Sequence, residues 1–211
     1  MCLMEMFRKI GVIPVIVLED PDDAIPVAKA LSDGGILCAE ITFRTDAAEE
    51  SIHRIASAFP DMLVGAGTVL SIDQAKKAAA AGAKFIVSPG TNPDIVKYCQ
   101  SIGMSICPGV QTPTEIEAAL SMGLKVVKFF PAEAAGGLKT IKALAAPYNM
   151  MEFVPTGGIN LSNIREYLSY EKVIACGGSW IASKNMIKAK DYEHIRETAA
   201  SASEIVKEVR G

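Results

Sequence analysis

The sequence predicts an α/β protein, a single-domain (β/α)8 TIM barrel that spans residues 1–211. Three observations support this fold. Eight short apolar segments alternate with amphipathic segments along the chain, as strands and helices do in βα units. The strand segments are apolar on both faces, which is typical of parallel strands covered by helices. No Gly-x-Gly-x-x-Gly follows the first strand, and this disfavours the alternative fold, an open doubly wound sheet.

The first four strands are expected at residues 12–18, 36–42, 62–67 and 85–88, because these runs are short and rich in apolar residues. The helices that follow should end near residues 31, 59, 81 and 102. They begin at residues that cap helices well, namely Asp20 with Pro21, Asp46, Ser71 and Asn92. Glycines follow the first and third of these helices, as is common at helix ends.

The last four strands are expected at residues 104–107, 124–130, 152–155 and 173–176. Thr112 should cap the helix that ends near Met122, with Glu115 completing a capping box. Two more helices are expected at 136–146 and 161–168, and a short helical turn at Trp180. The final helix, 192–209, carries an apolar stripe at three- and four-residue spacing, so it should pack onto the barrel.

The charge and hydropathy of the chain exclude several classes of partner. The net charge is −3 and the sequence pI is about 5.5, and the Lys and Arg residues are scattered, so we expect no binding to nucleic acid. The apolar start, residues 1–7, is too short for a signal segment, and no later run is long enough to span a membrane. We therefore expect a cytoplasmic protein that binds no membrane.

The cysteines and histidines indicate neither disulfides nor a metal site. The five cysteines are odd in number and widely spaced, without a CxxC pair, which favours buried thiols in a reducing compartment; they are Cys2, Cys38, Cys99, Cys107 and Cys176. His53 and His194 lie far apart in helical segments and lack a second ligand at helical spacing. We expect no metal and no other cofactor.

Lys128 is the most unusual residue of the sequence, because it lies within the apolar run 124–130. Burial disfavours the charged form of an amine, and the neutral amine is a nucleophile. Two other interpretations exist: the side chain reaches solvent from the strand end, or it forms an ion pair with an acid. Alternation along the strand places Val126, Lys128 and Phe130 on one face, which lies in the lumen if it points inward.

Further polar residues follow the other strands at the end where barrel enzymes place their active sites. On the second strand Glu40 is a buried carboxylate, followed by Arg44, and an ion pair of Glu40 with Arg44 or a helix lysine is the alternative to catalysis. Thr68 follows two glycines after the third strand, and Pro89 follows the fourth. Glycine-rich loops are common in turns, so these two loops alone predict little.

Two loops near the C-terminus predict a phosphate site. Strand seven ends in Thr156, Gly157 and Gly158, and strand eight ends in Gly177-Gly178-Ser179. Paired glycines expose backbone N–H groups to an anion, and barrel enzymes often bind phosphate after these two strands. An amine, a carboxylate, a guanidinium and an anion site together predict Schiff-base chemistry on a small phosphorylated 2-keto acid.

At these residues the chain resembles the 2-keto-3-deoxy-6-phosphogluconate (KDPG) and 4-hydroxy-2-oxoglutarate (KHG) aldolase family. The resemblance covers nearly the whole chain and consists of seven motifs in order: GVIPV at 11–15, EITFRT at 40–45, VGAGTV at 64–69, VSPG at 87–90, PGV at 108–110, VKFFPAE at 127–133 and PTGGI at 155–159. It implies a class I aldolase in a (β/α)8 barrel, commonly a homotrimer, that releases pyruvate and glyceraldehyde 3-phosphate.

The resemblance also implies a role for each site residue. Lys128 matches the Schiff-base lysine and Glu40 the general acid/base. The residues that match the pyruvate pocket are Arg44, Thr68, Pro89 and Phe130, and those that match the phosphate contacts are Gly157, Gly158 and Ser179. Thr156 matches a position that differs with sugar configuration, where threonine resembles the gluconate type.

Two other functions are compatible with a phosphate-binding barrel. The first is a phosphosugar isomerase or epimerase, which would need a pair of acid/base residues and would not be trapped with pyruvate. The second is a sugar-phosphate binding protein without activity, against which the Lys128 and Glu40 pair argues.

Overall fold

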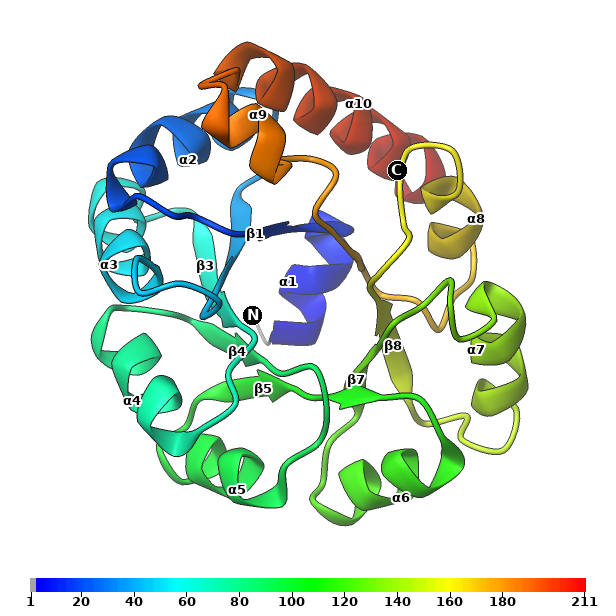
Figure 1. Ribbon diagram of the computed structural model, residues 1–211. Helices are drawn as coiled ribbons and strands as arrows, with labels where there is room; N and C mark the ends of the chain where they lie inside the picture. The colour runs from blue at the N-terminus through cyan, green and yellow to red at the C-terminus, as the bar shows by residue number, and fades with distance from the viewer. Residues whose placement is uncertain (1–2) are drawn as a thin grey trace.

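The computed structural model describes residues 3–211 and shows an α/β fold in which parallel strands form the inner layer and helices the outer layer (Figure 1). The strands are β1 Val12–Ile16, β2 Cys38–Thr42, β3 Leu63–Gly67, β4 Phe85–Val87, β5 Ser105–Cys107, β6 Gly109–Val110, β7 Val126–Phe129, β8 Glu152–Pro155 and β9 Cys176–Gly178. Cys2, predicted to be a buried thiol, lies outside the described residues.

The helices follow the strands as the sequence predicts, with one addition at the N-terminus. They are α1 Leu3–Ile10, the 3-10 helix η1 Pro21–Asp23, α2 Ala24–Asp33, α3 Ala48–Ala58, α4 Ile72–Ala80, α5 Pro93–Ser101, α6 Pro113–Ser121, α7 Gly137–Ala145, α8 Ile164–Leu168, α9 Lys184–Lys188 and α10 Tyr192–Arg210. Helix α1 was not predicted, because no Ser, Thr, Asp or Asn precedes Leu3 in the sequence to mark a helix start.

The strands form two parallel sheets. One has six strands in the order β5-β4-β3-β2-β1-β9, and the other has three in the order β6-β7-β8. Strands β5 and β6 are separated only by Pro108, which has no N–H to donate, and they belong to different sheets. At the other junction an isolated parallel bridge joins Thr156, after β8, to Gly177 of β9.

The last strand differs from the prediction. It was expected at 173–176, but β9 is Cys176–Gly178 and Val173 forms only an isolated bridge with Phe153. The glycines join the strand because they pair with Ile13 and Pro14 of β1. The helical turn expected at Trp180 is also displaced, since α9 begins at Lys184.

Helix caps confirm most of the predicted helix starts. Ser71, Asn92 and Thr112 each accept a hydrogen bond from a backbone N–H of the following turn, and Thr112 forms a capping box with Glu115. The Asp46 prediction was wrong, because α3 begins two residues later with Ala47 at the N-cap and without a side-chain cap.

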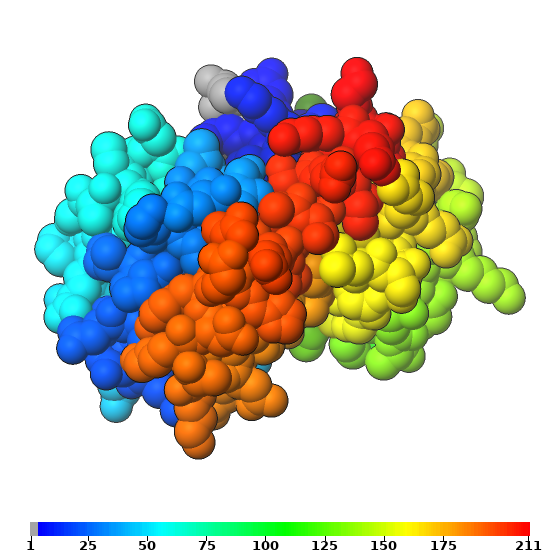
Figure 2. Space-filling model, turned by 90° about the horizontal axis from the view of Figure 1, so that it is seen from above, coloured from blue at the N-terminus to red at the C-terminus, as the bar shows by residue number. Residues whose placement is uncertain are grey.

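Helix α10 packs along the outside of the ring that the strands form in Figure 1. Its buried residues are Ile195, Thr198, Ala199, Ala202 and Val206, which confirms the predicted apolar stripe. Figure 2 shows α10, in red, beside the blue segment of α2 and the yellow segment of α8. Arg210 donates hydrogen bonds to the backbone carbonyls of Arg8, Val173 and Ile174, so the end of α10 is fixed against the start of the chain.

None of the helices within residues 3–211 combines the length and the apolar composition needed to cross a bilayer. The same residues contain no group of three or more His, Cys, Asp or Glu side chains arranged to hold a metal ion.

Candidate active site

Lys128 and Glu40 face each other inside the ring. The Nζ atom of Lys128, on β7, lies 3.9 Å from Oε1 of Glu40, on β2, and the two side chains are 7% and 3% exposed. The amine therefore does not reach solvent, and its nearest acid is Glu40. The alternative in which Glu40 pairs with Arg44 is not observed, because the guanidinium of Arg44 binds elsewhere.

The surroundings of Glu40 favour its protonated form. Burial raises the pKa of the Glu40 carboxyl, and the positive charges of Lys128 and Arg44 lower it by less. Oε1 of Glu40 accepts no hydrogen bond from the described residues, although it is buried. A buried carboxyl with a raised pKa and a free oxygen beside an amine is suited to transfer protons.

Glycines on β3 make room for this pair. A Cβ atom on Gly67 would lie 2.1 Å from Oε1 of Glu40, so only glycine allows the carboxyl to occupy its position. A Cβ atom on Gly65 would lie 2.2 Å from the ring of Phe85, which occupies the lumen next to β3. The glycines of the motif at 64–69 therefore make room for the side chains of Phe85 and Glu40, in addition to their place before the loop that carries Thr68.

An apolar floor lies beneath the site. The ring of Phe85 makes an edge-to-face contact with Phe7 of α1, with 5.0 Å between the ring centroids and an interplanar angle of 87°. Both rings are completely buried. Helix α1 precedes β1 and lies across the middle of the ring in Figure 1, so it covers the end of the lumen opposite the strand C-termini.

Phe130 and Cys107 also surround Lys128. The ring centroid of Phe130 lies 5.1 Å from Nζ, within the range of a cation–π contact. Burial raises the pKa of the Cys107 thiol to about 12, so this residue remains a neutral thiol. Sequence reasoning did not include Cys107 in the site, and its strand parity relative to the other lumen residues is the signal that could have found it.

Arg44 and Thr68 come together at the mouth. Nε of Arg44 donates to Oγ1 of Thr68 over 3.3 Å, and the Arg44 side chain is exposed. Thr68 has a φ of 54°, a left-handed conformation that is costly for a residue with a branched Cβ. Pro89 is half-buried after β4, where its carbonyl oxygen would lie 2.0 Å from a Cβ on Gly109.

The glycine loops meet at the same end of the ring. Gly157 and Gly158 follow β8 with φ values of 101° and 83°, which only glycine adopts readily. Thr156 is buried, and its Oγ1 would lie 2.3 Å from a Cβ on Gly177. Ser179 is exposed directly after β9.

A contact that the sequence did not predict connects the loop after β7 to the loop after β8. Tyr167, fully buried on α8, donates its hydroxyl to Oε1 of Glu133. The Glu133 N–H donates to the carbonyl of Gly157 over 3.0 Å, and a Cβ on Gly158 would lie 2.5 Å from Cγ of Glu133. Glu133 therefore fixes the shape of the Gly157-Gly158 turn.

A family model, "KDPG and KHG aldolase", matches residues 3–198. The chain belongs to the KDPG and KHG aldolase family. It is 48% identical over 204 residues to a 2-dehydro-3-deoxy-phosphogluconate aldolase of Treponema pallidum, with 97% of each chain covered. It is 42% identical to the KHG/KDPG aldolase of Escherichia coli K12, covering 92% of this chain and 91% of the relative.

A solved structure of the family has the same architecture. It is the KDPG aldolase of Legionella pneumophila, with pyruvate captured at low pH as a covalent carbinolamine intermediate. The TM-score is 0.92 at 39% sequence identity, with 95% of this chain and 98% of that chain covered. The family recognised from the seven motifs is thereby confirmed.

Proposed function

We propose that this protein is a class I aldolase that reversibly cleaves KDPG to pyruvate and glyceraldehyde 3-phosphate. The buried pair of Lys128 and Glu40 is the observation that carries the proposal, because an amine held beside a proton-transferring carboxyl is the machinery that Schiff-base chemistry needs. The names of relatives at 48% and 42% identity support the same substrate class.

The first part of the reaction forms the imine. The Lys128 amine attacks the ketone carbon C2 to give a carbinolamine, and loss of water then gives a protonated imine. Glu40 donates the proton that the departing hydroxyl needs. Oε1 of Glu40 lies 3.9 Å from Nζ, so the carboxyl is close to the carbon that the amine attacks.

The second part breaks the C3–C4 bond. The carboxylate of Glu40 accepts the proton of the C4 hydroxyl, the aldehyde forms at C4, and the bonding electrons move to the imine nitrogen to give an enamine. Glyceraldehyde 3-phosphate leaves. Glu40 then returns the proton to C3, and hydrolysis of the imine releases pyruvate and the free Lys128 amine.

Four residues are proposed to hold the pyruvate part of the substrate. Arg44 supplies a guanidinium for the substrate carboxylate, and Thr68, which accepts the Arg44 bond, orients that guanidinium. Pro89 and Phe130 shape the apolar wall around the methyl end, and the Phe130 ring also contacts the amine.

The phosphate is proposed to bind in the glycine loops. Gly157, Gly158 and Ser179 offer backbone N–H groups and a hydroxyl to the anion, and the positive φ values of the two glycines turn successive N–H groups to one side. Thr156 lies below this loop and is proposed to contact the hydroxyls of the sugar chain, in the manner of gluconate-type enzymes.

We propose KHG as a second substrate, cleaved to pyruvate and glyoxylate. The Escherichia coli relative is named KHG/KDPG aldolase, and the proposed pyruvate half of the site does not depend on a phosphate. A side-by-side rate comparison of KDPG and KHG measures the preference between them.

We also propose that the two sheets close into one barrel. If β5 and β6 are one strand interrupted at Pro108, and the Thr156–Gly177 bridge continues the ladder, the nine strands make a closed single-domain (β/α)8 barrel over residues 1–211. We further propose a homotrimer, which analytical ultracentrifugation tests. Four free thiols, Cys38, Cys99, Cys107 and Cys176, support a cytoplasmic location.

Trapping with borohydride tests the central claim. Incubation with pyruvate and borohydride should place one mass adduct on Lys128, and KDPG should release pyruvate in a coupled dehydrogenase assay. Lys128→Ala should lose both, whereas Lys125→Ala, one residue before β7 and exposed, should keep both. Equal labelling of the Lys128→Ala protein, or no pyruvate from KDPG with the wild-type protein, would refute the proposal.

A further inference from the structure

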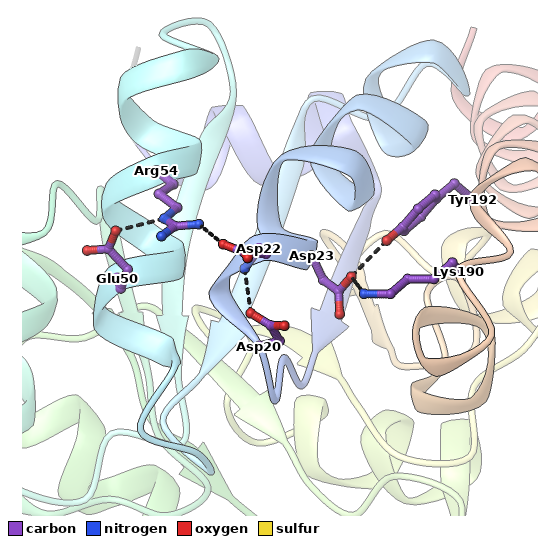
Figure 3. A network of polar contacts seen from close by, with 7 residues as sticks. All are labelled: Asp20, Asp22, Asp23, Glu50, Arg54, Lys190 and Tyr192. Atoms are coloured by element: carbon purple, nitrogen blue, oxygen red, sulfur yellow. Dashed lines mark hydrogen bonds and ion pairs between the residues drawn. The ribbon is translucent and has the colours of Figure 1, made fainter.

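The loop after β1 is tied to the segment after β9 by a buried carboxylate. The Asp23 side chain, in η1, is only 9% exposed, and its Oδ1 accepts hydrogen bonds from Nζ of Lys190 and, over 2.7 Å, from the hydroxyl of Tyr192 (Figure 3). Lys190 lies between α9 and α10, and Tyr192 is the first residue of α10. These contacts join residues more than 160 positions apart.

The backbone of Lys190 has a left-handed conformation, which is unusual for a residue other than glycine. Its φ is 56°, and its N–H donates to Ile187 O while the Asp191 N–H donates to Met186 O. These bonds form a Schellman motif, in which the residue at the position of Lys190 is usually glycine. Helices α2, α4, α5 and α6 do have a left-handed glycine after their ends, namely Gly35, Gly82, Gly103 and Gly123.

The side chain accounts for the exception at α9. Glycine would relieve the left-handed conformation, but it could not reach Asp23. Lysine therefore occupies a strained position and supplies the cation that a buried carboxylate requires. A second tie lies at the other end of α9, where Nζ of Lys184 is 2.6 Å from Glu19, although both groups are exposed. The helix is thus attached to the β1 loop at both ends.

The attached segment carries one wall of the proposed phosphate site. Ser179 directly follows β9, whose Gly178 pairs with Pro14 of β1, and only four residues separate Ser179 from α9. Holding α9 against η1 therefore restricts where Gly178 and Ser179 can lie relative to the Gly157-Gly158 turn. The other contacts in Figure 3, between Arg54, Glu50 and Asp22, fix the same η1 segment to α3.

We propose that Asp23 and Lys190 are positioning residues for the phosphate of the substrate. The inference rests on the proposed aldolase function, and it assigns to this pair a role that none of the predicted site residues has. Neither side chain contacts the substrate. Their ion pair fixes the position of the Ser179 segment relative to the Gly157-Gly158 turn. The pair therefore raises the affinity for the phosphorylated aldehyde and leaves the chemistry at Lys128 unchanged.

Lys190→Gly tests this proposal without weakening the turn. The variant removes the ion pair but relieves the left-handed backbone, and thermal unfolding measured on the same protein separates a loss of function from a loss of stability. In the synthetic direction, KM for glyceraldehyde 3-phosphate should rise roughly five- to tenfold, below the ~10²-fold that a 1 Å displacement of a reacting group can cost. KM for pyruvate, which has no phosphate, should stay the same. Lys190→Arg should restore the wild-type values.

Two further variants complete the experiment. Asp23→Asn should raise KM for the phosphorylated aldehyde in the same way as Lys190→Gly. Lys29→Met removes an exposed lysine that is paired with Asp33 on α2, so it controls for the loss of one positive charge, and it should change neither KM. An unchanged KM for glyceraldehyde 3-phosphate in Lys190→Gly, or an equal rise for pyruvate, would overturn the positioning role. Failure of the wild-type protein to condense the two substrates would instead refute the aldolase function.

Discussion

Gly67 and the Glu40 side chain lie so close together that no side chain fits on Gly67: a Cβ atom there would lie 2.1 Å from Oε1 and 2.8 Å from Cγ and Cδ of Glu40. Gly67 is the last residue of β3, and it pairs with Thr42 of β2, two residues beyond Glu40. The position of the Glu40 carboxyl therefore depends on the absence of a side chain on the neighbouring strand.

Gly67→Ala should reduce catalysis strongly. The added methyl group must displace the Glu40 carboxyl, and loss of a general acid/base costs about 10²- to 10⁴-fold in rate. Overpacking should also cost about 1–3 kcal/mol of stability. Steady-state kcat and thermal unfolding measure the two effects. Gly90→Ala is the control, since nothing lies within 4 Å of its added Cβ. A kcat within twofold of wild type for Gly67→Ala would contradict the prediction.

The pH dependence of cleavage should show the raised pKa of Glu40. Breaking the C3–C4 bond in the imine complex needs the Glu40 carboxylate, so kcat falls as pH falls through the Glu40 pKa, and burial moves that pKa above the ordinary value of 4.5. The acid limb of kcat should therefore have its midpoint above 4.5. It should be absent from the residual activity of Glu40→Gln. A midpoint at or below the ordinary value would show that another group controls the limb.

The same shift has a consequence for stability. The folded protein holds the Glu40 proton more tightly than the unfolded chain does, so this group favours folding below the unfolded pKa. Its contribution is lost as pH rises through the folded pKa. Urea unfolding across this window, compared between wild type and Glu40→Gln, measures the contribution of this group.

The buried thiols should be unreactive in the native protein. Burial raises the pKa of Cys107 to about 12 and that of Cys99 to about 11, and it raises the pKa values of Cys38 and Cys176 as well. At mildly alkaline pH the reactive thiolate is therefore scarce. Mass spectrometry after iodoacetamide treatment should find these four cysteines unmodified until urea unfolds the chain. Rapid native labelling of Cys107 would contradict its burial.

Tyr167→Phe should destabilise the protein by about 1–3 kcal/mol, because it removes the hydrogen bond that the buried Tyr167 hydroxyl donates to the charged carboxylate of Glu133, a residue that solvent also reaches. Urea unfolding measures the change. Tyr148→Phe is a matched control that removes a hydroxyl bonded to Glu117, over 2.9 Å at the surface, and it should leave the unfolding curve unchanged. Equal effects of the two substitutions would mean that burial of the Glu133 contact contributes nothing.

The sequence predicted the parts of the site that follow strand alternation. Lys128 and Glu40 each share one face of an apolar strand with the residues two positions away, which parity predicts, and the structure shows that these two faces point at each other inside the ring. The bond between Arg44 and Thr68 could not be predicted in this way, because it joins two loops and needs a left-handed threonine. Sequence reasoning therefore left open a pairing of Arg44 with Glu40 that the structure does not have.

In the fold, too, local features were predicted and contacts between distant segments were not. Helix starts with Ser, Thr or Asn caps were predicted correctly, because capping is a local interaction. Strand β9 was misplaced because Gly177 and Gly178 resemble a loop, and glycine weakens isolated strands. They are accommodated here since Thr156 and the Trp180 ring come so close that larger residues would collide with them.

The Phe7 and Phe85 rings beneath Lys128 also constrain the order of events. With apolar side chains packed on one side of the amine, reactants exchange only through the mouth where the glycine loops lie. The phosphorylated aldehyde is then the outer of the two fragments and the enamine the inner one. The Schiff base already holds pyruvate until the imine is hydrolysed, so glyceraldehyde 3-phosphate departs first. The closed end of the lumen adds the converse requirement for synthesis: pyruvate must enter and bind Lys128 before the phosphorylated aldehyde occupies the mouth.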